Sequence, residues 1–439
     1  MNGEHYAVVC VECGTRSADD GLITSCRGCA DASLLRTDYR AAALPVSAGA
    51  SGIFRYREWL PVAREIPGSS LPSVHRCQNL GAALGLTDLW VAFNGYWPER
   101  GSHLVSGTFK ELEAFTVLAR TPEDAGVMVV ASAGNTAASF ALAADQVDLP
   151  CVLVVPDRAL PDLGVIDALH GIGRRVRIVA VKGGTYNDAI AYSQGLLAAD
   201  PVFFPEGGVR NVARRDGLAV VMLAGYEAMG RLPDYYVQAV GSGTGAVAAH
   251  EASRRIAAQP GGGSVPRMLL CQNSEFAPLH RLWRHWEATG GAVAAGPGDG
   301  GAAGQRGTAG QEDVHAPELV NAAPPFAVRG GVRDILADSA GDVLVADGAA
   351  ARAAGALFEE TEGIDIEPAA AVAVACLREA VAAGRVPRDA RVLLNITGGG
   401  RRRTRELAGR HGPEPDAWLV GTAGEPAATA AMVLDSLAL

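Results

Sequence analysis

The sequence predicts an α/β protein with two open parallel sheets. Residues 126–240 alternate short apolar runs with segments of helical periodicity, which is typical of βαβ units and a parallel sheet. Two apolar runs, at 235–240 and 391–396, lead into glycine clusters at 241–245 and 398–400. Open α/β sheets place ligands at the carboxyl ends of their strands. A chain of 439 residues is long for one core, so we expect two or three domains.

Composition excludes some classes of function. The net charge is -10 and the pI about 5.4, which argues against nucleic acid as a partner because phosphate neutralisation needs a basic face. No apolar run reaches the roughly 20 residues that span a bilayer. The start lacks a basic region followed by an apolar stretch. We therefore expect a cytoplasmic protein with no membrane partner.

The apolar pattern places the elements of the sheets in order. We expect strands at 89–93, 127–131, 151–155, 176–181, 235–240 and 391–396. We expect helices at 110–120, 137–144, 186–197 and 217–229, one starting at 246, and one leading through 378. The Gly/Ala-rich stretch 289–312 has no periodicity and predicts a mobile surface insertion.

Four cysteines near the start have the spacing of a metal site. They form C-x2-C-x12-C-x2-C, with glycines beside two of them that permit tight knuckles: Cys10, Cys13, Cys26 and Cys29. Four thiolates close a tetrahedral Zn2+ site and leave no open position for catalysis. The sequence predicts a structural zinc ribbon, and the alternative is a set of free thiols. The other four cysteines have apolar surroundings typical of core residues: Cys77, Cys151, Cys271 and Cys376.

The basic residues single out one candidate for covalent catalysis. The chain has two lysines, Lys110 and Lys182, and arginine carries the remaining positive charge. Arginine stays protonated and cannot form a Schiff base, whereas lysine can lose its proton and attack a carbonyl. Lys110 opens a predicted helix, while Lys182 gathers no partner motif and is expected on the surface. The alternative for Lys110 is also an ordinary surface lysine.

The glycine cluster after the strand at 235–240 predicts a phosphate cradle. Its residues are Gly241, Ser242, Gly243, Thr244 and Gly245. Backbone amides at a strand-to-helix turn approach an anion closely, and the helix N-terminus favours negative charge. The spacing fits neither the dinucleotide fingerprint nor the Walker motif. A single phosphate group remains, with a tight turn that simply needs glycine as the alternative.

A reactive lysine and a one-phosphate cradle together suggest pyridoxal phosphate. Three motifs also resemble the threonine synthase-like enzymes of fold type II, which have the tryptophan synthase β-like fold: Ser106–Lys110, Ala131–Thr136 and Asn395–Gly400. The resemblance implies that Lys110 bonds to the cofactor, that Asn135 bonds to its 3′ oxygen and that Thr397 faces the pyridine nitrogen. A hydroxyl there limits carbanion delocalisation, which suits β-elimination.

Longer motifs resemble the cysteate synthase family over nearly the whole chain. They are residues 92–99, 109–114, 205–217, 238–245 and 362–366, together with the cysteine knuckles. The resemblance implies O-phospho-L-serine and sulfite as substrates and L-cysteate and phosphate as products, as in coenzyme M biosynthesis. It also implies that Lys110 removes the Cα proton as general base.

The substrates implied by this resemblance are anions, so their pocket needs polar groups and cations. The turn amides at a helix N-terminus suit a substrate carboxylate: Ser132, Ala133, Gly134 and Thr136. Arginine forks match tetrahedral oxyanions, and three arginines are candidates by position: Arg210, Arg214 and Arg215. Each is alternatively a solvated or ion-paired residue at a helix start, and the run 401–403 reads as a solvated face.

These inferences divide the chain into three parts. We expect a zinc-ribbon-like segment at 1–38, a large cofactor-binding domain at 39–112 and 231–439, and a small α/β domain at 113–230. The alternatives are a threonine synthase-like lyase acting on O-phosphohomoserine, a phosphoserine sulfhydrylase using sulfide, and a zinc-ribbon binding protein with an inactive fold. A homo-oligomer, dimer or trimer, is expected.

Overall fold

The computed structural model describes residues 5–29, 33–44, 46–47, 49–291, 314–409, 414–415, 417–420 and 425–438. From residue 292 on, the predicted Gly/Ala insertion lies outside the described residues. Among the helices within these ranges, none is long and apolar enough to cross a membrane.

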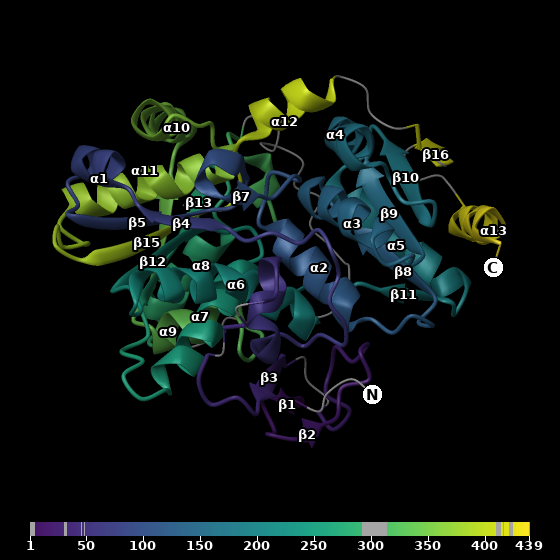
Figure 1. Ribbon diagram of the computed structural model, residues 1–439, viewed down its shortest axis with the longest axis horizontal. Coiled ribbons are helices and arrows are strands. Elements are labelled where there is room, and N and C mark those ends of the chain that lie inside the picture. The colour runs from purple at the N-terminus through teal and green to yellow at the C-terminus, as the bar shows by residue number, and fades with distance from the viewer. Residues whose placement is uncertain are drawn as a thin grey trace.

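A six-stranded sheet forms the larger half of the molecule (Figure 1). Its order is β14-β13-β12-β15-β5-β4, and β4 alone runs antiparallel to its neighbour. The central strands are buried on both faces because helices cover both sides. The strands are β4 (Ser73–Arg76), β5 (Asp88–Phe93), β12 (Tyr235–Ala239), β13 (Arg267–Asn273), β14 (Asp342–Ala346) and β15 (Arg391–Ile396).

Two groups of helices sandwich this sheet (Figure 1). One face carries α1 (Gln78–Leu84), α10 (Gly348–Glu362) and α11 (Pro368–Ala382). The other carries α6 (Val212–Met229), α7 (Thr244–Ala257), α8 (Pro278–Ala288) and α9 (Val332–Asp338).

A five-stranded parallel sheet forms the smaller half, in the order β11-β8-β9-β10-β16. Every residue of β9 is buried, as expected for a strand covered on both faces. Its strands are β8 (Val127–Ala131), β9 (Cys151–Pro156), β10 (Val176–Lys182), β11 (Phe203–Pro205) and β16 (Ala417–Val420). Its helices are α3 (Asn135–Asp145), α4 (Leu160–His170), α5 (Tyr186–Ala199) and α13 (Pro426–Leu437).

The C-terminal segment departs from the expected division of the chain. Residues 231–439 were assigned to the large domain, but β16 pairs in parallel with β10. Helix α13 then packs on α5, where the Tyr192 hydroxyl meets Thr429. The last described elements therefore extend the five-stranded sheet. Helix α6, expected in the small domain, packs on α7 and α2 beneath the six-stranded sheet.

Short elements join the two halves. Helix α2 (Lys110–Arg120) packs against α6 on one side and α3 on the other. Helix α12 (Arg401–Ala408) packs against α4 (Figure 1). The remaining elements are the hairpin β6 (Tyr96–Trp97) and β7 (Ser102–His103), and the 3-10 turns η1 (Gly52–Trp59), η2 (Pro98–Arg100), η3 (Asp157–Ala159), η4 (Gly208–Arg210) and η5 (Pro317–Leu319).

The N-terminal segment forms a small antiparallel sheet in the order β2-β1-β3. It docks on the end of α2 through a buried ion pair, in which Arg120 Nη2 lies 2.6 Å from Asp19 Oδ1. It also docks on α6, because Thr37 and Tyr39 both donate hydrogen bonds to Asp216. The strands are β1 (Tyr6–Cys10), β2 (Arg16–Ser17) and β3 (Leu35–Tyr39).

Candidate active site

Lys110 is the first residue of α2, and the backbone before it is fixed to the loop after β15. The Phe109 amide donates to the Thr397 carbonyl over 2.9 Å, and the Gly399 amide donates to the Gly107 carbonyl over 3.0 Å. Thr108 also forms a bridge with Gly398. These bonds bring Lys110 and the buried Thr397 together although 287 positions separate them in sequence (397 minus 110).

The Lys110 amine lies at a carboxylate. Its Nζ is 3.4 Å from Oε2 of Glu113, one helical turn further along α2, and the lysine side chain is 22% exposed. Burial lowers the pKa of Lys110 below its ordinary value, and the neighbouring Glu113 carboxylate opposes that fall. A partly buried lysine whose pKa is lowered can hold an unprotonated, nucleophilic amine.

Arg214 brings a second carboxylate to this site. Its Nη2 lies 2.5 Å from Glu113 Oε1, and its Nη1 lies 3.1 Å from Glu206 Oε2. Burial raises the pKa of Glu206, and Arg214 opposes that rise. Burial also acts to raise the pKa of Glu113, but Arg214 and then Lys110 hold it below its usual range. Glu113 therefore remains a carboxylate inside the protein.

The glycine turn, residues 241–245, lies close to Phe109, the residue before Lys110. Gly243 has φ +82, a left-handed conformation that favours glycine, and it caps the start of α7. The Ser242 and Thr244 hydroxyls are 2.8 Å apart. A Cβ on Gly245 would lie 2.8 Å from Cε2 of Phe109, the residue before Lys110. The predicted cradle thus lies close to the residue that precedes the predicted lysine.

The loop after β8 places Asn135 at the start of α3. The Ser132 hydroxyl accepts hydrogen bonds from the amides of Gly134 and Ala137, both at 3.0 Å, so this side chain shapes the turn. Ala133 is exposed, and Thr136 donates to Glu113 Oε1 over 3.3 Å. Thr136 therefore touches the charge cluster around Lys110.

Arg401 corrects an expectation from the sequence. The run 401–403 was interpreted as a solvated face, and Arg402 is 58% exposed, but the Arg401 side chain is 14% exposed. Its guanidinium contacts three side chains, Asn135 Oδ1 at 2.6 Å, Glu367 Oε1 at 2.6 Å and Asp162 Oδ2 at 2.8 Å. Burial raises the pKa of Glu367 to about 7, although Arg401 opposes this. The signal that sequence reasoning passed over was the position of Arg401 directly after a glycine cluster.

The other two candidate arginines, Arg210 and Arg215, form no ion pair with Glu113 or Glu206 within the described residues. The Arg215 side chain is 1% exposed, lies 3.1 Å from Glu251 and donates to the carbonyls of Leu35 and Val209. These contacts tie the N-terminal sheet to α6, which favours a structural role over the predicted contact with substrate. Arg210 ends η4 and is half-buried, and its guanidinium forms no ion pair within the described residues.

The four N-terminal cysteines converge as their spacing predicts. All four sulfurs lie within 4.8 Å of one another, and the pairs Cys10–Cys29 and Cys13–Cys26 are each 3.7 Å apart. A tetrahedral ion with Zn–S bonds of about 2.3 Å separates its sulfurs by about 3.8 Å. The donor set thus fits a metal ion. The other four cysteines are buried, as expected, and Lys182 is exposed.

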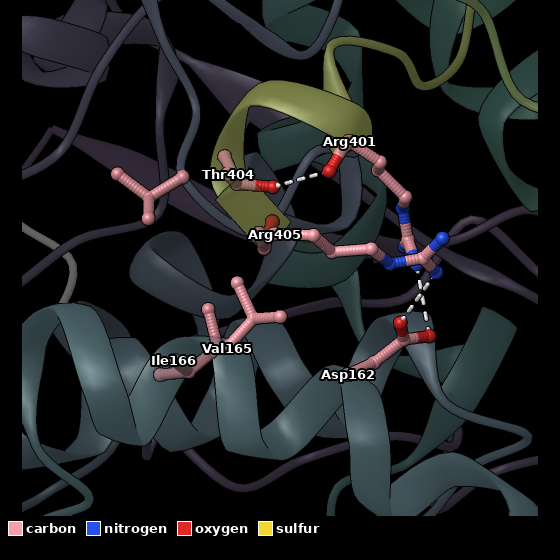
Figure 2. A pocket seen from close by; sticks show the side chains of 8 residues that line it. Asp162, Val165, Ile166, Arg401, Thr404 and Arg405 are labelled. Carbon is pink, nitrogen blue, oxygen red and sulfur yellow. Dashed lines mark hydrogen bonds and ion pairs between the residues drawn. The ribbon is translucent and has the colours of Figure 1, made fainter. Parts of the chain in front are cut away.

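A small cavity lies between α4 and α12, where Arg401 and Arg405 converge on Asp162 (Figure 2). Its volume is about 10 Å³, roughly the space of one water molecule. Lys110, Asn135 and the glycine turn do not line it. This cavity is therefore a feature of the junction between the halves and not the place of a substrate.

The residues around Lys110 fit pyridoxal phosphate on structural grounds. The partly buried amine lies beside a fixed carboxylate, the glycine turn at the N-terminus of α7 lies close to Phe109, and the Thr397 carbonyl accepts a hydrogen bond from the Phe109 amide. An amine, a phosphate cradle and a hydroxyl are the groups that this cofactor needs. The fold places them at the carboxyl ends of β12 and β15, next to the start of α2.

Comparisons with known proteins agree with this geometry. Residues 74–398 match the family described as pyridoxal-phosphate dependent enzyme. The cysteate synthase of Methanosphaerula palustris is 44% identical over 91% of both chains, and that of Methanospirillum hungatei is 41% identical over 94% of both. The chain belongs to the cysteate synthase family of pyridoxal-phosphate dependent enzymes.

Solved structures confirm the fold of this family member. Maize serine racemase superposes with a TM-score of 0.55 at 16% identity, covering 75% of this chain and 89% of its own. The serine racemase of Dictyostelium discoideum gives 0.54 at 15% identity, with 75% and 92% covered. At this level of identity the likeness concerns the fold alone, and it confirms the predicted fold type II.

Proposed function

We propose that this protein converts O-phospho-L-serine and sulfite into L-cysteate and phosphate. The observation that carries the proposal is the partly buried Lys110 amine beside Glu113, on a segment that lies close to the glycine turn, in a chain of this family. In the reaction the Cβ–O bond breaks and phosphate leaves with its electrons. The sulfur lone pair of sulfite then forms a C–S bond to Cβ, and the Cα proton is removed and returned.

The chain's own residues supply binding and proton transfer. We propose that the amides of Gly241–Gly245 hold the cofactor phosphate, that Asn135 orients the ring and that Thr397 faces its nitrogen. When bound, pyridoxal phosphate withdraws electrons from the substrate Cα and so acidifies its proton. The Lys110 amine takes that proton and later gives it back.

The substrate anions need cations and amides. We propose that the turn formed by Ser132, Ala133, Gly134 and Thr136 binds the substrate carboxylate at the start of α3, through amides other than that of Gly134, which donates to the Ser132 hydroxyl. Arg210 is our preferred cation for the phosphate or sulfite group, because its guanidinium forms no ion pair within the described residues. Arg214 is shared between Glu113 and Glu206 and is less available.

We also propose that the four N-terminal thiolates bind one structural zinc ion. Their sulfur separations support this, and four thiolates leave no open position for catalysis. The N-terminal segment that carries these cysteines packs on α2 and α6 and thereby supports α2, the helix that begins at Lys110.

Substrate competition tests the proposed reaction. Purified enzyme receives phosphoserine or phosphohomoserine, each with sulfite or sulfide, and both phosphate and amino-acid products are measured. The proposal predicts cysteate and phosphate from phosphoserine and sulfite at the highest kcat/KM. Release of phosphate from phosphohomoserine alone would show a threonine synthase-like lyase, and a preference for sulfide would show a sulfhydrylase.

A further inference from the structure

Glu113 is the group nearest to the reacting amine that the reaction above does not use. Its Oε2 lies 3.4 Å from Lys110 Nζ, and its side chain is fully buried. The two residues sit one turn apart at the start of α2, so their side chains share one face of the helix. A buried carboxylate needs partners for both oxygens, because an unpaired buried charge is costly.

The second carboxylate oxygen of Glu113, Oε1, is held by Arg214 and Thr136. This oxygen accepts a hydrogen bond from Arg214 Nη2 at 2.5 Å and one from Thr136 Oγ1 at 3.3 Å. Rotation of the carboxylate would break both bonds. Oε2 therefore remains directed at the lysine as a fixed acceptor.

The charges that face Lys110 come from three elements. They are Glu113 on its own helix, Arg214 on α6 and Glu206 after β11. Arg214, Glu206 and Glu113 also act on the Tyr186 hydroxyl at the start of α5. Within this cluster one lysine and one arginine face two carboxylates. Loss of the Glu113 charge would leave Arg214 with Glu206 as its one carboxylate partner among the described residues.

We propose that Glu113 is a positioning residue that aims the Lys110 amine and keeps a proton available on it. This rests on the proposed function in assigning Lys110 as the reacting group. Arg214 holds Glu113 as a carboxylate, so Glu113 does not itself carry the transferred proton. It accepts an N–H from Lys110 in the neutral and in the charged state. Removing its charge leaves burial and Arg214, which favour the neutral amine, opposed by Glu206, whose effect on Lys110 is smaller.

The lysine content of the chain permits a direct test without substrate. In a Lys182→Arg background, cofactor-free protein is acetylated with acetic anhydride over a range of pH. Mass spectrometry then follows the peptide that contains Lys110. Glu113→Gln should move the rate–pH profile to lower pH and raise the rate at a fixed pH below its midpoint about tenfold, since an opposite charge within 4–6 Å shifts a pKa by about 1–3.

Glu111→Gln is the matched control. Glu111 lies on the same helix, is equally buried and bonds to the Ser106 amide instead of the lysine. Its substitution should leave the profile of Lys110 in place. An unchanged profile in Glu113→Gln, or an equal shift in both variants, would overturn the proposal.

Two further measurements cover the case in which Glu113→Gln does not fold. Glu113→Asp keeps the charge but retracts it by one methylene, so the profile should shift in the same direction by less. In the cofactor-loaded enzyme, the midpoint of the pH titration of the visible absorption should shift more in Glu113→Gln than in Glu113→Asp. If the acetylation profile shifts and the wild type forms no cysteate, the proposed reaction fails while the role of Glu113 stands. Unshifted acetylation profiles in Glu113→Gln and Glu113→Asp refute that role.

Discussion

The Arg401 guanidinium donates a hydrogen bond to the amide oxygen of Asn135 over 2.6 Å. The same guanidinium contacts Glu367 at the cap of α11 and Asp162 on α4. Asn135 and Asp162 belong to helices of the five-stranded sheet, whereas Glu367 belongs to the six-stranded half. One side chain therefore joins the two halves at the residue we propose to orient the cofactor.

Replacing Arg401 by methionine should weaken both stability and cofactor binding. The change leaves Glu367 without its cation, leaves Asp162 with Arg405 alone, and removes the donor to Asn135. Breaking a buried pair by removing one partner costs about 3–5 kcal/mol. Thermal unfolding and titration with pyridoxal phosphate measure the two effects.

Arg402→Met is the matched control for that variant. Arg402 is the next residue of the run and pairs with Glu359 at the surface. Exposed pairs contribute about 0–1 kcal/mol, so this variant should resemble the wild type. Equal losses in both variants would contradict the role given to Arg401.

Gly245→Ala should disturb the cofactor site because the added methyl group would be too close to its neighbours. The new Cβ would lie 2.6 Å from Gln238 Nε2 and 2.8 Å from the Phe109 ring. Overpacking of this kind costs about 1–3 kcal/mol, and a shift of Phe109 also moves Lys110. Equilibrium binding of pyridoxal phosphate should weaken. Gly355→Ala in α10, where the nearest atom is 3.4 Å away, should be neutral or stabilising, and a comparable loss there would count against this explanation.

Glu111 should make stability depend on pH. Burial raises the pKa of this carboxyl from 4.5 to about 7. Between these values the folded chain retains a proton that the unfolded chain releases, so rising pH lowers the free energy of unfolding. Glu111→Gln removes this contribution and still offers an oxygen to the Ser106 amide.

Urea unfolding at pH 5 and pH 8 measures the effect. Glu111→Gln should gain up to a few kcal/mol over the wild type at pH 8 relative to pH 5. A difference between the two proteins that does not change with pH would contradict the raised pKa of Glu111.

Zinc removal should loosen the N-terminal sheet. We expect about one zinc ion per chain, and Cys13→Ser should lower that content together with the melting temperature. Cys151→Ala, in the buried strand β9, changes a cysteine outside the cluster and should keep the metal. Wild-type protein that holds no zinc after purification without chelators would contradict the proposed site.

Local patterns predicted most of the elements near the site. Helix α2 runs from Lys110 to Arg120 as expected, and β8 and β15 have the predicted bounds. These segments carry apolar residues at the period of their own element, so the sequence displays them directly. Lys110, Asn135 and Thr397 were identified by motif, and the backbone bonds around Phe109 bring the first and last of them together.

Relationships between distant segments were not visible in the sequence. The four residues of β16 carry no signal for their partner β10, and that pairing moved the C-terminal segment to the smaller sheet. Arginines 214, 215 and 401 look alike in sequence, yet their partners are set by tertiary packing. Glu113 gained its role only when α6 placed Arg214 beside it.

A paired turnover measurement tests the central claim most directly. Wild-type protein and Lys110→Ala, each loaded with pyridoxal phosphate, receive phosphoserine and sulfite, and cysteate and phosphate are quantified together. We predict equal amounts of cysteate and phosphate from the wild type and neither product from Lys110→Ala. Cysteate formation by Lys110→Ala, or none by the folded, loaded wild type, would contradict the claim.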